Sequence, residues 1–190
     1  MSINLLQPHS EYLHRAEPTP QARTIDIFAD IVRRDRGSPG DNDGRYKQKA
    51  CKELAYIYHM CDYESPFFQV PSATRHSEVV EAIFPDDPDW TPDELVQKGL
   101  ALYKKLSQTP SMRLLESAYN AVDELQTYFT EVQMSGEKNK GKVAKELIAS
   151  LGKLSAVVDS LNDLKERVNK EKSSSSEQWG GVELNEFNRG

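Results

Sequence analysis

The spacing of the apolar residues constrains this chain most, because they recur at intervals of three and four along much of its length. Between about Lys142 and Lys172 the steps are 4, 3, 4 and 3, through the positions Leu147, Leu151, Leu154, Val158 and Leu161. This alternation is typical of a helix that packs along another helix. At 1.5 Å per residue the helix would be roughly 45 Å long, so we expect part of it to pack on a separate helix or on another chain. The repeat weakens afterwards, where Lys165 and Val168 take the next positions.

The same periodicity predicts helices in the preceding residues, and no segment predicts a β-strand. Turn-forming residues at 37–44 and prolines at 66–71 separate the helical segments. The expected helices run from about Thr24 to Arg36, from Arg45 to Asp62, from Ser77 to Phe84, from near Thr91, and from Thr109 to about Met134.

Two of these helices are expected to start in the same way. Thr91 precedes Pro92, and Thr109 precedes Pro110. A threonine hydroxyl can cap the first free N–H groups of a helix, and proline is well tolerated at the first helical position.

These patterns predict an all-α fold with an extended arm at each end. Residues 1–22 are expected to form an N-terminal arm because prolines interrupt any helix there. A helical domain is expected over 23–135, the long helix over 136–172 and an extended tail over 173–190. Leu5 and Leu6 make the N-terminal arm more apolar than a solvated tail requires.

The C-terminal tail has the composition of a spacer followed by an anchor. Four serines at 173–176 precede a polar peptide that carries Trp179, Leu184 and Phe187. Large apolar side chains contribute most of the binding energy where a short peptide adds to another protein. We therefore expect these three residues to bind a partner chain, together with the stripe from Leu147 to Leu161 and the arm residues Leu5 and Leu6.

Composition and charge narrow the classes of partner. The formal net charge is −6, so counterion release on DNA or RNA would contribute little, and direct nucleic-acid binding is not expected. No stretch is apolar for long enough to span a membrane, and the first residues lack a signal-peptide pattern, so a cytoplasmic site of synthesis is expected. Cys51 and Cys61 should stay reduced, since ten residues on one helix place them about 15 Å apart.

The sequence predicts no catalytic, cofactor or metal site. His59, Cys51 and Cys61 lack the paired spacing of a zinc site. The turn at 37–44 fails the calcium-loop pattern at Pro39 and at Ala50. A cluster of basic residues around this turn, from Arg33 to Lys49, favours helix-end charge over a phosphate-binding role. We find no phosphate-binding loop, dinucleotide fingerprint or nucleophile elbow, and expect no enzyme activity.

Residues Lys47 to Phe129 resemble a family of small helical virion proteins of tailed bacteriophages, especially those of crAss-like and related large-genome phages. The resemblance is carried by KELAYIYHMCDYESPFF (52–68), by Arg75, by DDPDWTPDELVQKGLALYKKL (86–106) and by TPSMRLLESAYNAVDELQTYF (109–129). It covers a little under half of the chain.

The resemblance implies a structural role in the virion after synthesis in the host cytoplasm. We expect a head–tail connector or neck-ring subunit that forms a homo-oligomeric ring and binds portal, connector or tail proteins. One alternative is an assembly factor, a scaffold or chaperone that leaves the finished particle. Another is a nucleic-acid-binding regulator that uses the basic cluster.

Overall fold

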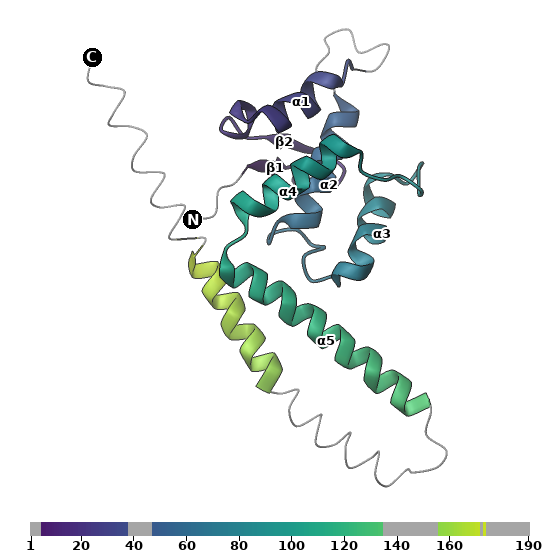
Figure 1. Cartoon of the computed structure of the whole chain (residues 1–190), viewed down its shortest axis with the longest axis vertical. Coiled ribbons are helices and arrows are strands. Elements are labelled where there is room, and N and C mark those ends of the chain that lie inside the picture. The colour runs from purple at the N-terminus through teal and green to yellow at the C-terminus, as the bar shows by residue number, and fades with distance from the viewer. Residues whose placement is uncertain (1–4, 38–46, 135–155, 172, 174–190) are drawn as a thin grey trace, which may run out of the picture. The chain divides into compact units, whose positions relative to one another are not determined.

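The computed structural model describes residues 5–37, 47–134, 156–171 and 173, and its fold is all-α apart from one two-stranded ribbon in that part of the chain (Figure 1). The expected fold class is therefore confirmed. The chain divides between Gln108 and Thr109 into two compact units. None of the helices among the described residues has the length and apolar character needed to cross a membrane.

The first unit contains the ribbon and four α-helices. Strands β1 and β2 pair antiparallel, with Leu6 opposite Pro18 and Pro8 opposite Ala16. A 3-10 turn at Ala22–Thr24 follows the ribbon. The elements are β1 (Leu6–Pro8), β2 (Ala16–Pro18), α1 (Asp26–Arg34), α2 (Gln48–Cys61), α3 (Ser72–Ile83) and α4 (Glu94–Ser107).

Helix α2 lies in the middle of this unit, and the ribbon, α1, α3 and α4 all pack against it (Figure 1). Its sequence contains several good helix formers, among them alanine, leucine, lysine and glutamate, and has neither glycine nor proline. Nine of its residues are buried, from Ala50 to Cys61, so apolar and polar side chains alike face neighbours. Both cysteines are free, as their spacing on one helix predicts.

The expectation of an N-terminal arm needs correction from residue 5 onward. Leu5 and Leu6 are 1% and 0% exposed and belong to the core of their own unit, so they are not available to a partner. Pro8 and Pro18 prevent a helix, but each can occupy a short two-stranded ribbon with free edges. The N–H of Thr19 donates to the carbonyl of Leu5 and ties the second strand to the start of the first. The boundary between units also differs from the one expected near residue 135.

The two expected Thr-Pro helix starts have different outcomes. Thr109 does cap α5 (Pro110–Met134), because its hydroxyl accepts the N–H of Met112 at 3.3 Å. Helix α4 instead begins at Glu94, two residues later than Pro92, and its cap is Asp93, which accepts the N–H of Val96 at 3.0 Å. A carboxylate carries a full negative charge to the positive end of the helix, which makes Asp93 the stronger cap.

His59 on α2 fixes the loop between the two strands. Its Nε2 lies 3.0 Å from the carbonyl oxygen of Leu13 and its Nδ1 lies 3.0 Å from the hydroxyl of Ser65. A carbonyl only accepts, so Nε2 carries a proton. The Ser65 hydroxyl donates to the backbone carbonyl of His59 at 3.1 Å, which ties the residues after α2 to the same histidine. Burial lowers the pKa of His59, although the Leu13 carbonyl and the charge of Asp62 oppose that effect.

Arg75 is 1% exposed, and it hydrogen-bonds to backbone carbonyls at the end of α2 and in the segment between α2 and α3. Its guanidinium donates to the carbonyls of Val70, Phe68 and Met60 at 2.9–3.3 Å. It also lies over the ring of Phe68. A buried carbonyl without a donor destabilises the folded state, so this arginine replaces the hydrogen bonds that a regular helix would have made.

We expect Arg75→Met to destabilise the protein by roughly 3 kcal/mol or more, because it leaves several buried carbonyls without donors. Urea unfolding followed by circular dichroism would measure the loss. The control is Arg33→Met, whose side chain is 71% exposed and pairs with Asp30. This substitution should change stability by less than about 0.5 kcal/mol. Equal effects of the two substitutions would contradict the role assigned to Arg75.

Stability should also fall as the pH drops below about 6.5, the ordinary pKa of histidine. The folded state holds His59 neutral, so in this window the unfolded chain binds a proton that the folded chain does not. Urea titrations at pH 7.5 and pH 5.5 would show the difference. His59→Gln keeps a donor for Leu13 and should reduce the pH dependence. His14→Gln would measure the contribution of His14 to the same pH dependence, because the pKa of His14 is also lowered. An unchanged pH dependence in both variants would contradict the assignment.

Candidate functional site

The second unit is a hairpin of α5 and a helix over residues 156–171, which run antiparallel (Figure 1). At its base the hydroxyls of Thr109 and Ser111 donate to the two carboxylate oxygens of Glu171. These hydrogen bonds hold the pKa of Glu171 below its usual range. Further along, the ammonium of Lys165 lies 5.5 Å from the centre of the Tyr119 ring. The two contacts fix which residues of the helices lie at the same level.

One stripe of α5 is turned inward. Met112 and Leu115 are 2% and 0% exposed, and Tyr119 and Val122 continue the stripe at steps of four and three. On the second helix the buried positions are Leu161 and Val168, with Val157 and Leu164 half-buried. The observed inner stripe of this helix therefore runs through 157, 161, 164 and 168, again at steps of 4, 3 and 4.

A second stripe of α5 is turned outward. Leu114, Leu125 and Tyr128 are 57%, 39% and 57% exposed, and the alanines at 118 and 121 lie between them. These five positions, which we call the outer stripe, follow steps of 4, 3, 4 and 3. Coiled-coil spacing on an exposed face is the arrangement that accepts a helix from another molecule.

Some of the expected partner-binding residues are buried, one is exposed, and the others lie outside the described residues. Of the long-helix stripe, Leu161 is buried, Val158 is 49% exposed and the positions before them lie outside the described residues. Val168, in the part where the repeat was expected to weaken, is 0% exposed. The positions outside the described residues are Leu147, Leu151, Leu154, Trp179, Leu184 and Phe187.

Periodicity could have identified the outer stripe, because its spacing is visible in the sequence. The structure separates inward and outward residues that are neighbours in the chain, such as Leu115 and Leu114.

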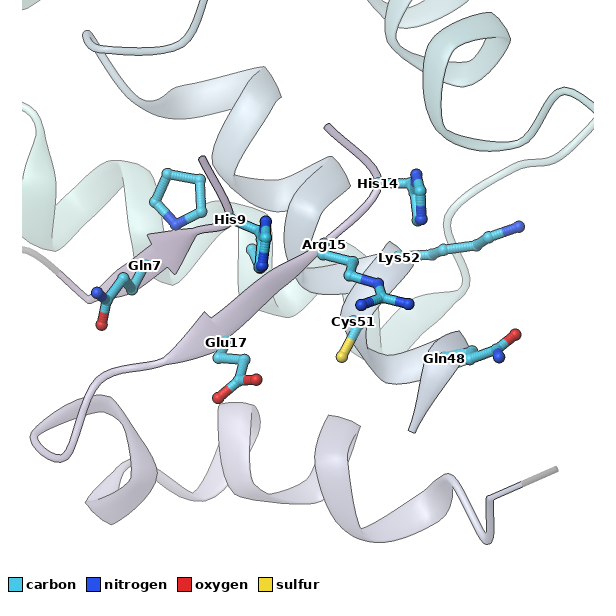
Figure 2. Close-up of a pocket in the computed structure, with 10 residues that line it drawn as sticks. Gln7, His9, His14, Arg15, Glu17, Gln48, Cys51 and Lys52 are labelled. Atoms are coloured by element: carbon cyan, nitrogen blue, oxygen red, sulfur yellow. The ribbon is translucent and has the colours of Figure 1, made fainter. Parts of the chain in front are cut away.

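The first unit holds a cavity of about 520 Å³ between the ribbon and the start of α2 (Figure 2). We call it the basic pocket. Two of its lining residues, Arg15 and Lys52, carry positive charge, and Glu17 carries negative charge. The lining residues are Gln7, Pro8, His9, His14, Arg15, Ala16, Glu17, Gln48, Cys51 and Lys52.

The ribbon loop brings the two histidines of the pocket together. The N–H of His9 donates to the carbonyl of Arg15 at 2.9 Å, which closes the loop. The ring of Tyr12 lies between His9 and His14, at 5.0 and 5.7 Å from their centres, and the Arg15 guanidinium lies 5.1 Å from the Tyr12 ring. The sequence does not indicate this grouping, because a loop between two three-residue strands leaves little pattern in a sequence.

The charges of the pocket act on its titratable groups. Burial lowers the pKa of His14, and the positive charges of Arg15 and Lys52 lower it further. Burial raises the pKa of the Cys51 thiol, with the charge of Glu17 acting in the same direction. A protonated thiol is a weak nucleophile, so Cys51 is poorly suited to attack a substrate.

The residues considered for chemistry or phosphate binding elsewhere have structural contacts. Cys61 lies 4.0 Å from the carbonyl of Leu100. In the basic cluster near the turn, Arg34 pairs with Glu53 and Asp93, and Lys47 donates to the carbonyl of Val32. Within the described ranges, no group of three histidine, cysteine or acidic side chains is arranged to hold a metal ion.

The described part of the chain thus presents an exposed apolar stripe of helical spacing and a cavity bordered by two cations. Comparisons with protein-family models, with curated proteins and with solved structures find no match for this chain.

Proposed function

We propose that the chain is a structural protein of a tailed-phage virion, a head–tail connector or neck-ring subunit that binds neighbouring copies of itself through its helical hairpin. The outer stripe of α5 carries this proposal. The resemblance of residues 47–129 to helical virion proteins supports the particle as its setting. The chain would be made in the host cytoplasm and would act without catalysis.

The length and chemistry of the outer stripe fit a helix from a neighbouring copy. From Leu114 to Tyr128 the stripe extends over roughly 21 Å, since each residue rises 1.5 Å. Burying each of its large side chains would contribute about 1.5–3 kcal/mol. In a ring every copy would make the same contact, so a weak pairwise association would become stable through repetition.

The C-terminal residues have a separate proposed role. Trp179, Leu184 and Phe187 would anchor the tail on a portal, connector or tail protein. The support for this contact is compositional, from the serine spacer and the three large apolar side chains.

Leu125→Glu should reduce self-association by at least about tenfold, because it places a charge within an apolar contact. Sedimentation velocity over a range of concentrations would measure the association. The matched control is Thr127→Glu, which adds the same charge at an exposed position on another face of α5. Circular dichroism would confirm that both variants keep the helical content of the parent.

Two results would overturn the proposal. A parent chain that stays monomeric at high concentration would exclude self-association through the stripe. Mass spectrometry of purified particles tests the setting: a virion subunit is present in the finished particle, whereas a scaffold or chaperone appears only in assembly intermediates.

A further inference from the structure

The basic pocket is the feature of the first unit that the assembly role leaves unexplained. It lies between the ribbon and α2, and none of its lining residues belongs to the helical hairpin. We propose that this pocket binds a small molecule that carries a phosphate monoester.

The first argument is charge. Arg15 lines the pocket from the ribbon and Lys52 from α2, so two cations from separate elements border one cavity (Figure 2). The Lys52 side chain extends away from Arg15, with its ammonium 5.8 Å from the centre of the Phe84 ring, at the edge of the pocket. The charged residues of the lining, two positive and one negative, leave one net positive charge on a chain whose net charge is −6, and a local positive potential attracts anions. The carboxylate of the lining, Glu17, lies 3.7 Å from the guanidinium of Arg23, which is not a lining residue.

The second argument is the number and kind of donors. Arg15 offers a planar fork and Lys52 a point charge, and these are the two side chains that bind phosphate groups most often. His9 and His14 add ring nitrogens, and Gln7 and Gln48 add amides. A phosphate monoester carries three terminal oxygens and close to two negative charges at neutral pH, so it can accept from several of these groups together.

The third argument is the rigidity of the cavity. His59 holds the ribbon loop through the Leu13 carbonyl, and the Tyr12 ring lies between the two pocket histidines. Asp35 accepts the N–H of Ala50, so a side chain of the protein already occupies the positive end of α2. The anion would therefore be held by side chains and not by the helix end.

The fourth argument is size. A cavity of about 520 Å³ lies within the range of about 300–1,000 Å³ usual for small-ligand sites. It exceeds what a phosphate ion alone requires, so an organic group attached to the phosphate would also be accommodated.

Isothermal titration calorimetry of the full chain at low ionic strength tests the proposal, with phenyl phosphate as the probe. We expect saturable binding with one site per chain. Arg15→Gln and Lys52→Gln should each weaken it by roughly tenfold or more, as expected for loss of a charge-assisted hydrogen bond. The matched controls Arg33→Gln and Lys98→Gln remove the same charge at exposed positions outside the pocket and should leave the affinity unchanged.

Further probes distinguish the sources of the anion. Benzoate should bind much more weakly than phenyl phosphate, because it offers one charge and two oxygens. Inorganic phosphate binding as tightly as the ester would support the anion site and assign it to the free ion. The proposal is overturned by absence of saturable binding, by equal losses in pocket and control variants, or by a short oligonucleotide that binds more tightly than phenyl phosphate. The His14 ring offers a local signal, because its NMR titration should move to higher pH when the anion is bound.

Discussion

The first unit depends on the burial of α2, because a helix enclosed by its neighbours must find partners for every polar side chain it carries inward. Glu53 meets Arg34 of α1, Tyr56 meets His76 of α3, and His59 meets the ribbon loop. Asp62, at the end of the helix, accepts the hydroxyl of Tyr103 from α4. Each surrounding element is thus tied to α2 by a different polar contact. Apolar packing alone tolerates several arrangements, whereas a buried polar group left without its partner destabilises the fold by about 1–3 kcal/mol.

In the ion pair between Glu53 and Arg34, the cost of burying a charge is opposed by the attraction of the opposite charge. Burial raises the pKa of this carboxyl, and Arg34 acts against that effect. Arg34 also reaches Asp93, the residue that caps α4, so one guanidinium connects α1, α2 and the start of α4. Close packing accompanies the polar contacts, because a side chain at Gly99 of α4 would lie 2.8 Å from the Ile57 methyl group. Helix α4 can approach α2 this closely because position 99 carries no Cβ.

Hydrophobic periodicity predicted most helices of this chain, because apolar residues at steps of three and four mark the buried face of a helix whatever it packs against. The same signal could not predict the ribbon, whose strands of three residues each include a proline. It also could not predict the basic pocket, since His14 and Lys52 lie on elements that only the tertiary fold brings together. Arg75 stands in the region of family resemblance, but nothing local to it indicates that it is buried among carbonyls. Periodicity identifies faces, whereas partners depend on the fold.

In the hairpin, too, specific side-chain contacts fix how the elements lie beside each other. Thr109 and Ser111 hydrogen-bond to Glu171, and Tyr119 contacts Lys165. Because the two helices are antiparallel, a residue of α5 lies beside a residue of the second helix when their two numbers sum to about 282. By this register Val158 lies near the level of Leu125, and both are exposed. The buried residues Met112, Leu115, Leu161 and Val168 belong to the half nearer the base. The polar and cation–π contacts that join the two helices therefore lie nearer the base, whereas Leu125 and Val158, at one level further along the hairpin, are exposed.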